Sequence, residues 1–258
     1  MAAQIDLGLH IAHLPVRTID VDAPSRWMVS AWRDFSRAPA LSLGCGAVFV
    51  AVGYVIVLGL QQIGLGSLVP VLVASFFLVA PVLAAGFYEI SRRAESGQSS
   101  GLGHALGAFG RNPAGLAGIG LVLMLAVAAW AQLAFLIFML FFHSAPPGLD
   151  NFIYGVLTSE QAVPFLVVGT FAGSVIAAIV FAITAVSIPL LLDRDVPVLT
   201  AMATSVAAVR RNWKVMIGWA ATIVLLVGVG LSAFFMGLAL ALPLVAYGTW
   251  HAYRDLVE

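Results

Sequence analysis

Long apolar runs alternate with short charged segments along most of the chain. A helix needs roughly twenty apolar residues to cross the about 30 Å of hydrocarbon in a bilayer, and six runs approach or exceed that length. We place these six spans approximately at residues 43–60, 68–88, 114–142, 164–192, 214–233 and 236–250. The pattern therefore predicts an all-α, polytopic membrane helix bundle of six spans.

The last two predicted spans are separated by almost no polar sequence. Residues 214–250 are too few for two full crossings, so we expect a tight hairpin with a short or tilted arm. One long helix is the alternative, because only Gly228, Gly230 and Gly237 mark a break. An odd number of spans would place the C-terminus on the outside.

The basic residues predict the orientation. Cytoplasmic loops retain Lys and Arg during insertion, and in the six-span arrangement all 12 of them lie on one side. Asp150 and Glu160 are the only charges on the other side. We therefore expect both termini in the cytoplasm. No secretory signal peptide is evident near the N-terminus.

An internal repeat precedes three of the spans. A gap-free alignment places Arg37, Arg111 and Arg211 at one position, and a glycine follows seven residues later in each copy. Each copy predicts a short amphipathic helix, a break, and a membrane hairpin. The amphipathic faces contain Trp27, Ala31, Trp32 and Phe35; Leu102, Ala105, Leu106 and Phe109; and Val198, Met202, Val206 and Val209.

The repeat divides the chain into one tail and one membrane domain. We expect a cytoplasmic N-terminal tail over residues 1–23 and a single membrane domain over residues 24–258, with tandem repeats at 24–93, 99–195 and 196–258. Because each unit contains two crossings, all three units share one orientation. The glycines that we expect at close contacts between helices are Gly44, Gly118 and Gly218, with a GxxxG motif at Gly169 and Gly173.

Charged residues gather where the second helix of each predicted hairpin ends. If the bundle is pseudo-threefold, these charges converge at its cytoplasmic end, which we call the inner rim. Ion pairs that tie the helix ends together are the favoured interpretation, and a site for an anion or a lipid headgroup is the alternative. This candidate inner-rim cluster contains Glu89, Asp193, Arg194, Asp195, His251, Arg254 and Asp255.

Four arginines stand at the junctions between the amphipathic and the spanning helices. Arginine at such a place commonly anchors a helix by extending its guanidinium to the interface. Specific binding of anionic lipid headgroups is the alternative. These candidate lipid-headgroup anchors are Arg37, Arg111, Arg210 and Arg211.

Composition narrows the functional classes. Of the 258 residues, 62% are hydrophobic and only 9% are charged, which excludes a water-soluble globular protein. The net charge of zero makes nucleic-acid binding an unexpected function. The single cysteine, Cys45, cannot form an internal disulfide. No catalytic, cofactor or metal signature stands out, and the notable polar groups inside the spans are Tyr54, Gln132 and Thr184.

Three segments carry a resemblance to a known family. The repeat, together with FYEISRR at residues 87–93, SIPLLLDRD at 187–195 and TWHAYRDLV at 249–257, resembles a bacterial family of predicted integral membrane proteins, a domain of unknown function. The resemblance covers nearly the whole chain, from about Val16 to Glu258. It implies a bacterial inner membrane and transfers no catalytic residues. Some members of that family are labelled putative cytochrome c oxidase subunit.

The oxidase label can be tested against the residues. A haem-copper catalytic subunit needs several histidines inside the membrane, and none of the five histidines here lies in the middle of a span. We therefore predict a non-enzymatic protein without a cofactor that acts through membrane lipid or other membrane proteins. One alternative is a small-solute transporter or channel, which a cavity lined by Gln132 and the inner-rim charges would favour. The other is an accessory or assembly factor of a respiratory oxidase.

Overall fold

A computed structural model describes residues 13–144, 147 and 152–258, and these residues are largely helical. Apart from helices, they contain one isolated antiparallel bridge, between Val16 and Val257. The helices are α1 (Ala23–Arg37), α2 (Pro39–Gln62), η1 (Gly66–Leu68), α3 (Val69–Leu83), α4 (Ala85–Glu95), α5 (Leu102–Gly107), η2 (Ala108–Gly110), α6 (Pro113–Phe142), α7 (Phe152–Leu157), α8 (Ala162–Thr184), α9 (Ser187–Asp193), α10 (Val198–Arg211), α11 (Trp213–Ser232) and α12 (Leu238–Leu256).

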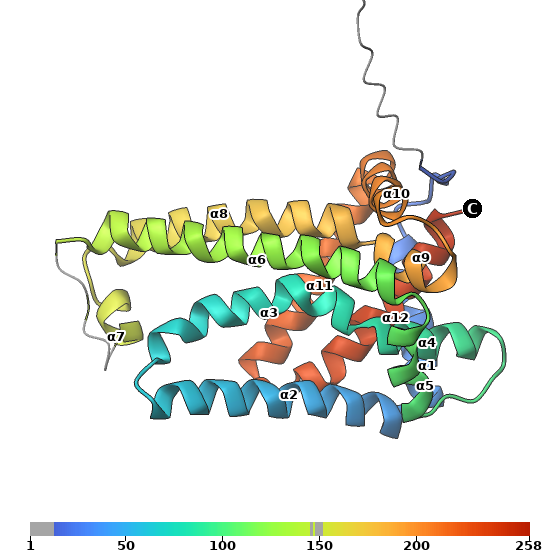
Figure 1. Cartoon of the computed structure of the whole chain (residues 1–258), viewed down its shortest axis with the longest axis horizontal. Helices are drawn as coiled ribbons and strands as arrows, with labels where there is room; N and C mark the ends of the chain where they lie inside the picture. Colours follow the sequence, from blue (N-terminus) through green and yellow to red (C-terminus); the bar gives the residue numbers. More distant parts are fainter. Residues whose placement is uncertain (1–12, 145–146, 148–151) are drawn as a thin grey trace, which may run out of the picture.

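The long helices extend from one end of the molecule, where the short helices gather (Figure 1). Helix α3 packs on α6, α6 packs on α8, and α2 packs on α12. Helices α1, α4, α5, α9 and α10 lie together at one end with the C-terminus, and α7 lies at the opposite end (Figure 1). We call the first end the head, and it includes the C-terminal half of α12.

Five helical segments are long and apolar enough to cross a membrane, which makes this an integral membrane protein. They are Pro39–Gln62, Gly66–Glu95, Pro113–Phe142, Ala162–Asp193 and Trp213–Ser232. The sixth predicted span, at residues 236–250, falls in α12 and is not among them. Helix α12 is instead mostly buried by protein, and it ends in polar residues such as His251 and Arg254.

Helices α11 and α12 form the tight hairpin that the sequence predicts, and the alternative of one long helix is wrong. The turn places Phe234 and Phe235 at positive φ, and a Cβ on Gly237 would lie only 2.7 Å from the Cα of Gly230. Glycine is therefore needed where the two helices meet. The hydroxyl of Tyr54 donates to the carbonyl of Phe234, so the turn reaches only part of the way along α2.

The second and fourth predicted spans bend before they reach the head. Helix α3 gives way to α4 at Ala84, and α8 gives way to α9 at Ala185 and Val186. Each break has a proline nearby, Pro81 or Pro189, whose missing N–H removes a helical hydrogen bond. The breaks redirect α4 and α9 into the head.

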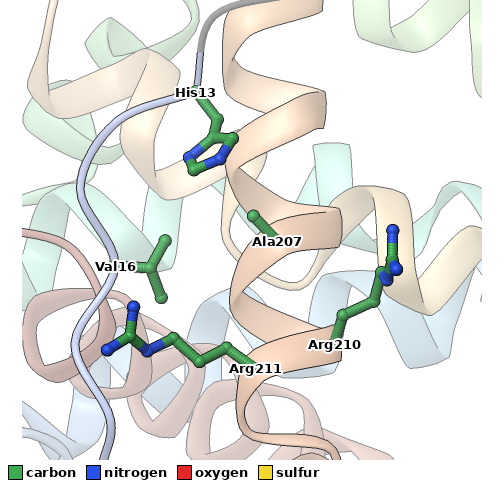
Figure 2. A pocket seen from close by; sticks show the side chains of 5 residues that line it. All are labelled: His13, Val16, Ala207, Arg210 and Arg211. Atoms are coloured by element: carbon green, nitrogen blue, oxygen red, sulfur yellow. The ribbon is translucent and has the colours of Figure 1, made fainter.

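Residues 13–22 lie against the head, so the described part of the predicted tail is held in place. The backbone N–H of Arg17 donates to Leu256 O at 2.9 Å, and that of Leu14 donates to Thr204 Oγ1 at 3.0 Å. Figure 2 shows this segment beside α10, from His13 past Val16. Residues 1–12 of the predicted tail lie outside the described residues.

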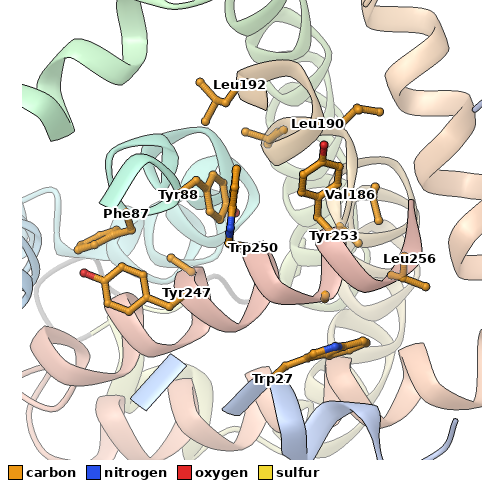
Figure 3. Packing of buried hydrophobic residues seen from close by; sticks show 14 of the residues in the cluster. Trp27, Phe87, Tyr88, Val186, Leu190, Leu192, Tyr247, Trp250, Tyr253 and Leu256 are labelled. Atoms are coloured by element: carbon orange, nitrogen blue, oxygen red, sulfur yellow. The ribbon is translucent and has the colours of Figure 1, made fainter. Parts of the chain in front are cut away.

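The main buried core lies in the head, around α12. Trp27 meets Trp219 edge to face, with ring centroids 5.5 Å apart, and Trp250 meets Tyr253 at the same distance. Figure 3 shows Tyr88, Leu190 and Trp250 converging from α4, α9 and α12. Four of the five candidate spans bury much less, and α2 buries only Ser42 and Gly46; the exception is Ala162–Asp193, which includes the buried helix α9. Aromatic packing in the head therefore sets the directions in which the membrane-spanning helices extend from it.

Some of the expected glycine contacts are present and others are not. A Cβ at Gly44 or Gly218 would meet nothing within 4 Å in the described chain, whereas one at Gly118 would lie 2.9 Å from Val198 Cγ2. The closest helix approach is at Gly46, where a Cβ would clash with the backbone of Ala239. In the predicted GxxxG motif, Gly173 faces Trp130 and Gly169 faces open space. The expectation was therefore wrong for Gly44 and Gly218, because the repeat position alone does not determine which helix face meets a neighbour.

Candidate functional site: a polar network in the head

A buried carboxylate, Asp34 of α1, stands at the centre of the head, only 3% exposed. Its Oδ2 atom lies 2.8 Å from His251 Nε2 and accepts a hydrogen bond from Ser91 Oγ at 2.7 Å. Arg37 Nη1 is 3.6 Å from the other carboxylate oxygen. A buried carboxylate needs such partners to offset the cost of leaving water.

The network continues from His251 toward α9. His251 Nδ1 lies 3.6 Å from Glu95 Oε1, and Arg254 Nε lies 3.4 Å from Glu95 Oε2. Arg254 Nη1 is 3.3 Å from Asp193 Oδ2, which also accepts a hydrogen bond from the Tyr253 hydroxyl at 2.6 Å. Burial raises the pKa of Tyr253 above its ordinary value, and the hydrogen bond to Asp193 raises it further. The network therefore ties together α1, α4, α9 and α12.

Glu89 forms a second buried carboxylate site on α4. Arg92 makes a bidentate pair with it, at 2.8 and 2.7 Å, and Arg111 Nε lies 3.8 Å away. Arg111 also donates to Leu192 O at 3.0 Å, at the end of α9. The contact between Glu89 and Arg111 therefore joins α4 to the start of α6, and the bond from Arg111 to Leu192 O adds α9.

The structure brings together four of the seven predicted inner-rim residues in these ion pairs: Glu89, Asp193, His251 and Arg254. Asp255 instead accepts a hydrogen bond from Trp27 Nε1 at 2.7 Å. Burial raises the pKa of Tyr253, and the nearby Arg194 opposes this rise. Asp195 is exposed and has no side-chain partner among the described residues.

Asp34, Ser91, Glu95 and Tyr253 belong to the network, although they are not among the residues predicted from the sequence. The repeat contained a signal for Asp34. In the gap-free alignment, its position is occupied by Ala108 and Ala208 in the other two copies, and all three positions are buried. An ionisable residue at a position that is otherwise a buried alanine indicates a specific partner.

The four candidate anchor arginines divide into three with partners and one without. Arg37 donates to Ala94 O at 3.3 Å, Arg111 donates to Leu192 O, and Arg211 donates to Thr18 Oγ1 at 2.8 Å. Arg210 has no ion pair or side-chain hydrogen bond among residues 13–144, 147 and 152–258. Arg210 and Arg211 leave α10 on opposite sides in Figure 2. Both line an open cavity of about 430 Å³ beside His13.

The polar residues of the spans do not join the head network. Gln132 lies on the exposed side of α6, and the Thr184 hydroxyl donates to Val180 O within its own helix, at 2.7 Å. Within the described ranges, no three His, Cys, Asp or Glu side chains are arranged to hold a metal ion. The network therefore consists of ion pairs and hydrogen bonds between helix ends.

The comparison with protein families found one match. Residues 68–193, just under half of the chain, match the model of a family described as predicted integral membrane protein (DUF2189). This segment runs from the start of α3 to the end of α9. The match supports the resemblance seen in the sequence, and the description names no oxidase. No curated protein and no solved structure matches the chain.

Proposed function

We propose that this integral membrane protein is a non-catalytic, multi-pass protein of a bacterial inner membrane that acts through lipids or other membrane proteins. Its head and both termini lie in the cytoplasm. The observation that carries this proposal is the pairing of Asp34, Glu89, Glu95 and Asp193 with basic side chains of other segments: His251, Arg111 and Arg254. Because these paired side chains join helix ends to one another, they form a rigid platform at one end of the apolar spans.

The distribution of basic residues supports the orientation. All 12 Lys and Arg residues lie in residues 13–22, in α1, α4 and α10, or at those ends of α6, α9, α11 and α12 that meet the head. Glu160 lies at the opposite end, between α7 and α8. A concentration of Lys and Arg on one side marks the cytoplasmic side of a bilayer.

Similar contacts of two of the three repeat arginines support an architecture of three tandem hairpin units. Arg37 donates to Ala94 O, one residue after its own predicted unit, and Arg111 donates to Leu192 O, near the end of its unit. Arg211 donates to Thr18, and the neighbouring Arg17 bonds the end of the third unit at Leu256. Because α12 returns to the head, both ends of the third hairpin lie on one side even though it is short.

Exposed apolar side chains on α1, α5 and α10 support contact between the head and the membrane surface. They include Val29, Trp32, Leu102, Leu106 and Leu199. Amphipathic helices with such residues lie in the interface with the apolar face toward the acyl chains. The helices would hold the platform flat against the inner leaflet.

Labelling of single cysteines tests the orientation. In a Cys45→Ser background, we would introduce Glu160→Cys at the α7 end and Arg33→Cys in the head, both at exposed positions. A membrane-impermeant maleimide applied to intact spheroplasts is expected to label the first and to spare the second. Labelling of Arg33→Cys alone would overturn the proposed orientation.

Co-purification tests the mode of action and the oxidase alternative. The tagged full chain would be isolated from native membranes in mild detergent, and its associated proteins and lipids identified by mass spectrometry. Reproducible retention of lipid or of a stoichiometric membrane-protein partner is expected. Recovery of oxidase subunits as the stoichiometric partner would specify an accessory function. Recovery of the chain with neither lipid nor a protein partner would contradict the proposal.

A further inference from the structure

We propose that the groove beside α10 binds one anionic phospholipid, with its phosphate at Arg210 and an acyl chain along Leu199, Met202 and Val206. This inference deepens the proposed function and rests on the head lying at the membrane surface. It names the class of lipid and the side chains that select it.

Two adjoining cavities form the groove. The cavity of about 430 Å³ and a second of about 350 Å³ share His13, Ala207 and Arg210. The second continues along α10 to Leu199 and is bounded on the other side by Ile183 near the end of α8. Each cavity is large enough for a headgroup and too small for a whole phospholipid, so the acyl chain would leave along the apolar wall.

The apolar wall is a single stripe of α10. Leu199, Met202, Val206 and Arg210 follow one another at helical spacings of three and four, so they share one side of the helix. A neighbouring side of α10 is held against α8, where Ser205 Oγ donates to Ala182 O at 2.8 Å. The stripe remains accessible, and Leu199 is 59% exposed.

The charge at the end of the stripe selects an anion. Arg210 is exposed and has no partner within the described chain, and His13 contributes a further nitrogen at the shared wall. No carboxylate is among the described residues that line either cavity. Arginine binds phosphate oxygens with its planar fork of donors, so a lipid phosphate is the matching group.

Trp213 marks the depth at which this site lies. It is the first residue of the span α11 and is 56% exposed, with Lys214 Nζ 5.5 Å from its ring centroid. Tryptophan is enriched at the headgroup level of a bilayer. Arg210, three residues earlier in the chain, therefore stands near the depth of lipid phosphates.

Native mass spectrometry of the full-length chain in detergent tests the site. The wild-type chain is expected to retain phosphatidylglycerol in preference to phosphatidylcholine, and Arg210→Gln is expected to weaken phosphatidylglycerol binding about fivefold, the effect of one basic residue. Arg33→Gln is the matched control, since Arg33 is exposed on α1 and lines neither cavity. Equal binding of the two lipids, or equal losses in the two variants, would overturn the proposal.

A second comparison separates a lipid site from a site for free phosphate. Met202→Gln is expected to weaken phosphatidylglycerol binding, and excess inorganic phosphate is expected to leave the lipid bound. Displacement by phosphate together with an unchanged Met202→Gln variant would assign the groove to free phosphate. Binding in detergent does not depend on orientation, so a failure of the cysteine-labelling experiment would overturn the proposed orientation without affecting this result.

Discussion

His251 Nε2 lies 2.8 Å from Asp34 Oδ2, although 217 positions separate the two residues. The contact joins the last helix of the third predicted repeat to the first helix of the first. Ser91 of α4 donates to the same carboxylate oxygen. A single buried carboxylate therefore links three helices of the head.

Removal of the Asp34 carboxylate is expected to destabilise the protein by about 3 kcal/mol, because it leaves His251 and Ser91 without their buried partner. Asp34→Ala would be compared with wild type by thermal unfolding in mild detergent. Asp22→Ala is the matched control, since its pair with Arg26 is exposed and contributes less than about 0.5 kcal/mol. Equal effects of the two substitutions would contradict a structural role for the buried pair.

Gly46→Ala is expected to destabilise the packing of α2 on α12 by about 1–3 kcal/mol. The added Cβ would clash with the backbone of Ala239, which cannot move as a side chain would. Gly44→Ala, two residues earlier on a different side of α2, would meet nothing within 4 Å in the described chain and is expected to cause no loss. Unfolding temperatures of the two variants in one detergent provide the comparison, and a smaller loss for Gly46→Ala than for Gly44→Ala would contradict it.

The sequence predicts the helix starts well because they depend on local signals. Pro39 and Pro113 are the first residues of α2 and α6, four residues and one residue before the predicted starts of these spans at 43 and 114. The burial of α12 could not be predicted in the same way. An apolar helix surface suits both lipid and protein, so hydrophobicity alone does not distinguish the two environments.

The difference between local signals and tertiary contacts also explains which residues of the candidate site could be predicted from the sequence. Glu89 and His251 were selected because charges at the ends of apolar helices are conspicuous. Asp34 was missed because an acidic residue in an amphipathic helix is usually solvated, and its partner is distant in sequence. Arg37 and Arg111 were read as anchors, and their bonds to the carbonyls of Ala94 and Leu192 depend on tertiary structure.

Tyr253→Phe is expected to change the response of the protein to alkaline pH. Burial raises the pKa of Tyr253, so its hydroxyl stabilises the fold below the ordinary tyrosine pKa of about 10, and this contribution is lost as the pH rises further. At pH 8 the variant should be about 1–2 kcal/mol less stable, because the hydrogen bond to Asp193 is absent. Above pH 10 the difference should shrink.

Unfolding measured from pH 8 to pH 11 checks this prediction. Tyr154→Phe is the control, since Tyr154 is exposed on α7 and should show no difference from wild type at any pH. A difference between Tyr253→Phe and wild type that stays constant across the range would contradict the assigned role of burial.

Asn212 is expected to hold residues 13–22 against the head. Its Oδ1 accepts from the Ile19 N–H at 3.0 Å, and its Nδ2 donates to Arg17 O at 2.9 Å. Asn212→Ala removes both bonds while the bridge between Val16 and Val257 remains, so the segment should open locally without global unfolding. Limited trypsin digestion in detergent is expected to cleave after Arg17 several times faster than in wild type.

Asn112→Ala provides the matched control for this experiment. Asn112 occupies the equivalent position in the second predicted repeat, but its amide donates to Leu191 O and its oxygen accepts from the Gly115 N–H. Its removal should disturb the start of α6 and leave cleavage after Arg17 unchanged. Of the two asparagines, only Asn212 bonds to residues 13–22. Equal acceleration of that cleavage in both variants would therefore indicate general loosening of the head and contradict a specific role of Asn212.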